Sequence, residues 1–311
     1  MDDDDVDGVH LVYQYFRVKQ QSPSSSSSTS SQPTSPSSSF RRQDQDKDYE
    51  VFNKRQEEYD YCLTRNLCHE NVACVHILFE SDSDLEATTS MLSQQHVVDK
   101  ETLSTKLHPT ILGRQMLYSD AMEYANEKLS GKVVVILNAD IYLGQGVEML
   151  CRSKHLLEPT TKNGHPASVM SLTRHEHGIC KHIPQEMAST DHQPQQHQQY
   201  NNGGDDTWCG CPFMKGRKYY GSHDSFWFIS PLDSTVIRNC QHVQNRWGSE
   251  HKVINELLNA GYQVINPSLT IHTYHHHATD IHPWRHQQGG RVALADPRDH
   301  IRLPPTELID L

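Results

Sequence analysis

The sequence predicts an α/β fold built on a mainly parallel mixed sheet flanked by helices. Within the strand expected at 132–137 (KVVVIL), the five aliphatic residues 133–137 are an unbroken apolar run, typical of a strand buried on both faces at the centre of such a sheet. Upstream of this run, segments with strand-like and helix-like apolar patterns alternate along the chain. That alternation predicts parallel strands joined by right-handed crossovers.

The first half of the chain supplies three strands and two helices in this alternation. Residues 9–18 are rich in Val, Tyr and Phe, as strands are, and residues 47–66 place apolar side chains at helical spacing. In order, we expect a strand at 9–18, a helix at 47–66, a strand at 72–79, a polar connection over 81–107, a helix at about 112–129 and the strand at 132–137.

The second half is less regular but has one well-marked helix, at 249–260. We expect Ser249 to act as its N-cap and Gly261 to end it, with an apolar stripe between them. The strands expected around it are 167–173, 225–229, 262–265 and the closing segment 271–277.

Two polar stretches interrupt these elements, at about 20–46 and at 185–206. The first contains the Ser-rich run 22–39, and the second is nearly free of apolar side chains. Neither buries enough apolar surface to offset the entropy of ordering, so we expect both to be disordered insertions. The C-terminal residues 284–311 are polar and predict an irregular tail.

Charge and cysteine content narrow the classes of function. A formal net charge of -11 argues against nucleic-acid binding, which needs basic surfaces. The eight cysteines are irregularly spaced, and for a chain of 311 residues we expect reduced thiols rather than a disulfide framework.

No run approaches the ~20 apolar residues of a membrane span. The acidic start predicts a cytoplasmic protein, with the Golgi or secretory lumen as the alternative if the N-terminus is truncated.

The strongest functional clue follows the strand at 132–137, where Asn138 and Asp140 stand two residues apart. Ligands of open α/β sheets bind beyond the carboxyl ends of the strands, and strand alternation would place both side chains on one face. Asp140 suits either a divalent cation or the capping of the next turn. Asn138 suits either a sugar or ribose hydroxyl or the loop backbone.

Two further segments offer polar groups to such a site. His275 and His277 are two residues apart, so they share one face of an extended segment, and imidazoles placed in this way suit Mn²⁺ or Zn²⁺. The alternative is that a chain with 22 histidines has such a run by chance. Asp224 opens an aromatic strand that could stack and hydrogen-bond a sugar ring. The alternative is an Asp that merely begins a core strand.

Three more residues are candidates near the helix starts. Glu250 lies in a first helical turn, where the macrodipole stabilises a carboxylate, and it could serve as a general base if it faced the site. Trp247 precedes it and is a candidate for substrate binding. Arg114 suits a phosphate, or is a solvated arginine at a helix start. The chain lacks the signature motifs of P-loop NTPases, α/β-hydrolases and zincins.

Taken in order, three pieces of the sequence resemble the GT-A class of nucleotide-sugar-dependent glycosyltransferases. The pieces are VVVILNADIYL, GSHDSFWFISP and WGSEHKVINELLNAGYQVINPSLTIHTYHHH. The resemblance spans roughly residues 9–280 without the insertions. It implies a single Rossmann-like (GT-A) domain over about 1–283 that binds a nucleoside-diphosphate sugar.

The resemblance also implies roles for individual residues. Mn²⁺ or Mg²⁺ would bridge the diphosphate and Asp140, with His275 or His277 as a second ligand. Asn138 stands where the family often has its first Asp, which leaves one carboxylate on this strand. Glu250 matches the base of inverting members, and Asp224 would hold the donor sugar or the acceptor.

The function expected from these features is transfer of a sugar from a nucleoside-diphosphate sugar to a hydroxyl of a glycan, protein or small molecule. A nucleotidyltransferase-like enzyme is the first alternative, although its Gly-rich loop would stand where Lys19 and the Ser-rich run are found. The second is a non-catalytic sugar- or metal-binding protein that keeps the fold, which Asn138 would suit.

Overall fold

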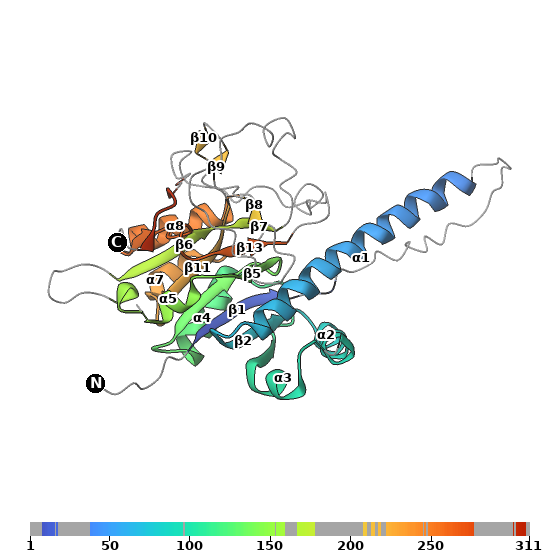
Figure 1. The fold of residues 1–311 in the computed structure, drawn as a ribbon, viewed down its shortest axis with the longest axis horizontal. Coiled ribbons are helices and arrows are strands. Elements are labelled where there is room, and N and C mark those ends of the chain that lie inside the picture. The colour runs from blue at the N-terminus through green and yellow to red at the C-terminus, as the bar shows by residue number, and fades with distance from the viewer. Residues whose placement is uncertain are drawn as a thin grey trace.

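A seven-stranded sheet with strand order β12-β6-β11-β4-β1-β2-β3 forms the centre of the computed structural model (Figure 1). The structure describes residues 8–15, 17, 38–95, 97–152, 154–158, 167–177, 208–209, 213–214, 217–218, 222–244, 246, 248–276, 301 and 303–308. The strands of this sheet are β1 (Val9–Tyr15), β2 (Val72–Phe79), β3 (Leu107–Ile111), β4 (Val133–Leu137), β6 (Ser168–Thr173), β11 (His223–Ile229) and β12 (Gln263–Ile265).

The sheet is mainly parallel but mixed, as the sequence predicts. Strands β4, β1, β2 and β3 run parallel, and β12 runs parallel to β6. Strand β11 is antiparallel to both of its neighbours, β4 and β6. The chain builds outward from β1 through β2 to β3 and then returns to add β4 on the other side of β1. The strand order therefore reverses between β1 and β4, and this is the point of an open α/β sheet where ligands bind.

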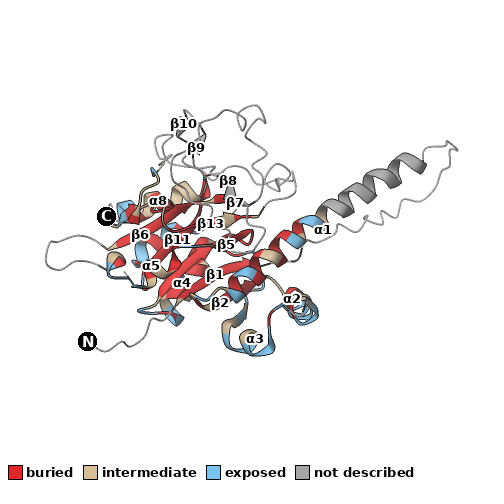
Figure 2. Ribbon diagram, viewed as in Figure 1, coloured by how far each residue is buried: buried red, intermediate tan, exposed pale blue. Residues whose placement is uncertain are grey.

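Helices cover both faces of the sheet. Leu63 of α1 and Leu150 of α5 belong to the same buried cluster as Leu11 of β1. Met122 of α4 and Ile254 of α8 belong to the cluster on the opposite face. Figure 2 shows that the central strands are buried, whereas α2 and α3 are largely exposed. The helices are α1 (Ser38–Cys68), α2 (Asp82–Gln95), α3 (Lys100–Lys106), α4 (Tyr118–Lys128), α5 (Val147–Arg152), α7 (Ser234–Asn239), α8 (Ser249–Asn259) and the 3-10 helix η1 (Lys154–Leu157).

A smaller sheet with the order β5-β13-β7-β8 lies beyond the end of β4. The buried Asn66 of α1 holds it in place, because its side chain donates to Ile141 O at 3.0 Å and accepts from Leu143 N at 2.9 Å. The strands outside the main sheet are β5 (Ile141–Leu143), β7 (His175–His177), β8 (Trp208–Cys209), β13 (Thr273–His275) and the separate pair β9 (Phe213–Met214) and β10 (Arg217–Lys218).

The polar connection expected over 81–107 is wrong, because it contains helices α2 and α3. Side-chain caps stabilise the starts of both. Ser81 Oγ accepts from Asp84 N at 3.3 Å, and Asp99 Oδ1 accepts from Thr102 N at 2.8 Å. These helices lack a strong apolar stripe, so periodicity alone does not reveal them.

Helix α4 begins at Tyr118 rather than at about 112. Gly113 has φ +75, a left-handed conformation that does not continue a helix, and residues 107–111 pair with β2 as an edge strand. Helix α1 begins at Ser38, earlier than the expected 47 and inside the stretch assigned to the first insertion.

The second insertion, 185–206, lies outside the described residues. The described part of the tail, 301 and 303–308, contacts the domain: Thr306 N donates to Asn266 O at 2.9 Å, and Leu308 is buried. Five cysteines in the described part of the chain, Cys62, Cys68, Cys74, Cys151 and Cys240, are free thiols. None of the helices that the structure describes combines the length and apolar character that crossing a membrane requires.

The close approach of Gly146 to the segment before β13 generates a stability prediction. Gly146 has φ +88, and a Cβ there would lie 2.0 Å from Thr270 O. Gly131 has a similar φ of +78 but open space around the same position. We expect Gly146→Ala to lower the free energy of unfolding by at least about 2 kcal/mol more than Gly131→Ala. Urea denaturation measures both, and equal losses would contradict the tight contact.

Candidate functional site

The candidate site begins where β4 ends. Strand β4 stops at Leu137, and Ile141 N donates to Asn138 O at 3.1 Å to close a turn. The strand alternation expected to put Asn138 and Asp140 on one face therefore does not apply, because these residues are in the turn. Both are nevertheless buried, with exposed fractions of 2% and 5%. They lie at the carboxyl end of β4, next to the point where the strand order reverses.

Two side chains, those of Arg55 and His275, hold the Asp140 carboxylate. Arg55 Nη2 donates to Asp140 Oδ2 at 2.6 Å, and His275 Nε2 lies 3.2 Å from the same oxygen. Burial alone would raise the pKa of Asp140, but Arg55 and His275 outweigh it and hold that pKa well below its usual range. Asp140 is therefore an ionised carboxylate. Its other oxygen, Oδ1, is buried and has no hydrogen-bond partner among the residues that the structure describes.

Arg55 has no role in the sequence-based prediction. It extends from α1 and also contacts Glu58 and the hydroxyl of Tyr59. The helical spacing does indicate that Arg55 is buried, since position 55 lies on the same helix face as the buried Tyr59 and Leu63. A charged residue on a buried helix face requires a partner, which the pattern does not identify.

A second group of polar side chains joins the end of β4 to β11. Asn138 Nδ2 donates to Asp224 Oδ1 at 2.9 Å, and Arg174 Nη1 donates to Asp224 Oδ2 at 2.9 Å. Asp224 is at an irregularity in the pairing of β11 with β6, and such bulges redirect side chains. Arg174, which follows β6, was also missed from the sequence. It lies near enough to help lower the pKa of Asp140.

Glu250 lies in the first turn of α8, close to this second group. Helix α8 starts after Gly248, which has φ 90, whereas the Ser249 hydroxyl donates to Arg246 O at 2.7 Å. The predicted N-cap at Ser249 is therefore wrong by one residue. Burial raises the pKa of Glu250 to about 8, and the negative charge of Asp224 adds to this shift. Glu250 thus exchanges its proton near neutral pH, as an acid–base group requires.

The aromatic wall expected after Asp224 does not exist as a binding surface. Phe226, Trp227 and Phe228 are at most 1% exposed and pack in the hydrophobic core. Strong β-propensity and alternating core contacts explain the aromatic run. Asp224 is therefore the group of this segment that faces the polar cluster.

The remaining predicted site residues are placed as follows. Arg114 is 53% exposed and donates to both oxygens of Asp120, at 2.7 and 2.6 Å, so it forms a surface ion pair. Trp247 and His277 lie outside the described residues. The predicted residues that the structure brings together are Asn138, Asp140, Asp224, Glu250 and His275.

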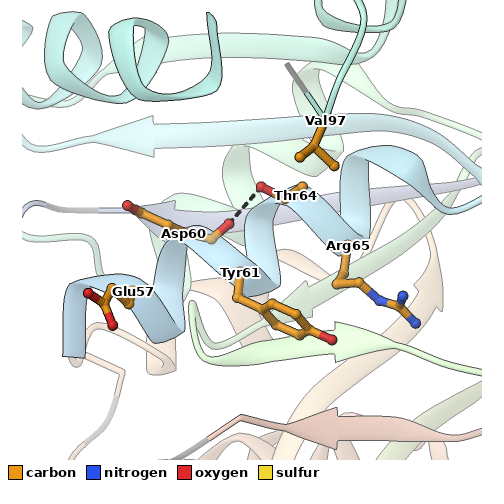
Figure 3. Close-up of a pocket in the computed structure, with 6 residues that line it drawn as sticks. All are labelled: Glu57, Asp60, Tyr61, Thr64, Arg65 and Val97. Atoms are coloured by element: carbon orange, nitrogen blue, oxygen red, sulfur yellow. Dashed lines mark hydrogen bonds between the residues drawn. The ribbon is translucent and has the colours of Figure 1, made fainter. Parts of the chain in front are cut away.

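A surface hollow of about 470 Å³ lies beside α1 (Figure 3). It is on a different side of the helix from Arg55 and contains none of the predicted site residues. Its lining residue Tyr61 approaches the segment next to His275, since the centroid of its ring lies 4.6 Å from that of His276. Its lining residues are Glu57, Asp60, Tyr61, Thr64, Arg65 and Val97.

The site is suited to a hard divalent cation. Asp140 Oδ1 and Asn138 Oδ1 are buried oxygens without hydrogen-bond partners in the described part of the chain. Carboxylate and amide oxygens are the ligands that Mg²⁺ and Mn²⁺ prefer, and an imidazole such as that of His275 suits Mn²⁺ as well. These three residues would hold the ion.

No protein-family model matches the chain, and no curated protein matches it by sequence. One similar solved structure is a mannosyltransferase from Pyrobaculum calidifontis in complex with GDP-Man and Mn²⁺, with 10% identity and a TM-score of 0.40. That match covers 87% of this chain but only 56% of the mannosyltransferase. Another, from Bacillus anthracis, is assigned as a glucose-1-phosphate thymidylyltransferase and was solved in complex with a sucrose. It has 10% identity and a TM-score of 0.33, and the match covers 78% of this chain and 85% of that protein.

The buried ion pair at Asp140 generates a second stability prediction. Arg55→Met removes the closest cation from a buried carboxylate, and such losses cost about 3–5 kcal/mol. Arg114→Met breaks an exposed pair with Asp120 and should cost at most about 1 kcal/mol. Urea denaturation of both variants makes the comparison. Similar small losses for the two would show that Arg55 does not balance the charge of Asp140.

The raised pKa of Glu250 predicts a pH dependence of stability. The native state keeps this proton up to a pH of about 8, whereas the unfolded state loses it near 4.5. The contribution of Glu250 to the free energy of unfolding is therefore fully present below pH 4.5 and is lost as the pH rises through 8. Relative to Glu250→Gln, the wild type should lose free energy of unfolding between about pH 5 and about pH 9. The control Glu256→Gln, on the same helix, should keep the wild-type slope.

Proposed function

We propose that the chain is a GT-A-type glycosyltransferase that uses a divalent cation, Mn²⁺ or Mg²⁺, and a nucleoside-diphosphate sugar as donor. The observation that carries the proposal is the buried, ionised Asp140 at the reversal of strand order, whose Oδ1 has no hydrogen-bond partner among the described residues. The buried amide oxygen of Asn138, two residues earlier, likewise has none among them. When bound, the cation would stabilise the negative charge that develops on the diphosphate leaving group.

The chain's own residues supply the remaining requirements of transfer. Asn138 and Arg174 fix the orientation of the Asp224 carboxylate through both of its oxygens. Oriented in this way, Asp224 would accept hydrogen bonds from hydroxyls of the donor sugar or of the acceptor. Arg174 would keep its positive charge close to the reacting groups.

Glu250 would act as the general base. In the reaction, the acceptor oxygen forms a bond to the anomeric carbon, the bond from that carbon to the diphosphate breaks, and the acceptor proton moves to Glu250. A base is most effective when its pKa lies near the working pH, and burial brings Glu250 into that range. If Glu250 activates the acceptor on the face of the sugar opposite the leaving group, the reaction inverts the configuration of the anomeric carbon.

Variants at Asp140 and Glu250 test separate parts of this proposal. Asp140→Asn should weaken Mn²⁺-dependent donor binding by at least about 100-fold, because it removes an ionised ligand. Thermal shifts with UDP-, GDP- and CMP-sugars, with and without Mn²⁺, measure this. Glu250→Gln should leave donor affinity within about 2-fold but reduce transfer by about 10²–10⁴-fold.

Matched controls for the two variants are Glu123→Gln, an exposed carboxylate on α4, and Glu256→Gln on α8. Both should behave as the wild type. Normal Mn²⁺-dependent donor binding in Asp140→Asn would overturn the metal assignment. Release of pyrophosphate from a nucleoside triphosphate and a sugar 1-phosphate would instead identify a nucleotidyltransferase. Donor binding without transfer or hydrolysis would identify a binding protein.

A further inference from the structure

A second cluster of metal-binding side chains lies away from Asp140. His10 of β1 and Cys74 and His76 of β2 each offer a ligand atom, and these atoms all lie within 4.8 Å of one another. The strand register explains the juxtaposition: His10 is paired with Cys74, and His76 follows two residues later on the same face. Three potential ligands therefore come from two adjacent strands whose spacing is fixed by the sheet.

The cluster lies toward the amino ends of β1 and β2, whereas the candidate site lies beyond the carboxyl end of β4. His10 is the second residue of β1, whereas Asp140 follows the carboxyl end of β4. The cluster faces α4, since His76 Nδ1 lies 3.0 Å from the hydroxyl of Tyr124. Arg55, which holds Asp140, comes from α1 on the other face (Figure 1).

The arrangement of the nitrogens is close to that of a tetrahedral metal site. His10 Nδ1 and His76 Nε2 are 3.1 Å apart. On a tetrahedral zinc with bonds of about 2.0–2.1 Å, two nitrogen ligands are separated by about 3.4 Å. An ion could therefore replace the shared hydrogen of this pair after a shift of a few tenths of an ångström.

The surroundings supply the orientation and access that a metal site needs. A ligating imidazole usually donates its other N–H to an oxygen that fixes the ring, and Tyr124 offers that oxygen to His76. Cys74 is partly exposed, and the exposed His108 of edge strand β3 stacks on His76 at 4.9 Å. The cluster is thus reachable from solvent.

We propose that His10, Cys74 and His76 form a binding site for Zn²⁺ or a similar borderline-soft divalent ion. A thiolate with two imidazoles selects Zn²⁺ or Co²⁺ over Mn²⁺ and Mg²⁺, which prefer oxygen. Binding releases the Cys74 thiol proton and joins β1 to β2 through the metal. The fourth position is open to water or to His108. This site does not depend on the proposed transferase activity.

Titration of the full-length, metal-free protein with Co²⁺ tests the proposal, because a cobalt thiolate has a charge-transfer absorption that oxygen and nitrogen ligands lack. We expect one equivalent to produce this band and Zn²⁺ to abolish it. Cys74→Ser should lose the band, and His76→Gln should weaken Co²⁺ binding by at least about 100-fold. The control Cys151→Ser, at a free thiol of α5, should match the wild type.

Two results would overturn the site. One is the absence of a charge-transfer band in the wild type, and the other is a band that persists unchanged in Cys74→Ser. Circular dichroism establishes that each variant is folded. The wild-type spectrum by itself tests thiolate ligation, even if a variant does not fold. Asp140→Asn should leave the cobalt spectrum unchanged, which separates this site from the candidate active site.

Discussion

The charge of one buried carboxylate constrains much of the architecture at the carboxyl end of the sheet. Removing a carboxylate from water costs several kcal/mol, which only close cations or hydrogen bonds offset. Asp140 meets that requirement with Arg55 and His275, which are 85 and 135 residues away in sequence. The requirement therefore brings α1 and β13 to the end of β4. Asn66 and Gly146 support the same arrangement by holding the small sheet close to α1 and the main domain.

The charges of the site favour an additional cation. Glu58, Asp140 and Asp224 carry three negative charges, and Arg55 and Arg174 carry two positive ones. The sum is one excess negative charge while Glu250 holds its proton, and two when Glu250 is ionised. A divalent cation would balance the second state. Burial raises the pKa of Glu250, and the negative charge of the neighbouring Asp224 raises it further.

The fold and part of the site could be predicted from the sequence because they depend on local patterns. The apolar run before Asn138 marks the central strand, and the position of Asp140 after it follows from general rules for α/β sheets. Arg55 and Arg174 could not be predicted, because their roles arise from tertiary contacts with Asp140 and Asp224. Strand β3 was missed because it is short and contains Pro109, which only an edge strand accommodates readily.

The two proposed metal sites differ in ligand chemistry, and this difference allows a direct test of the role of Asp140. Crystals grown with Mn²⁺ and a nucleoside diphosphate would show the ion by anomalous scattering at the manganese edge. We predict an anomalous peak in contact with Asp140 Oδ1, and a shift of Arg55 away from that carboxylate. A peak at His10, Cys74 and His76 with none at Asp140 would contradict the account, as would an unchanged Arg55–Asp140 pair in crystals that bind the nucleotide elsewhere.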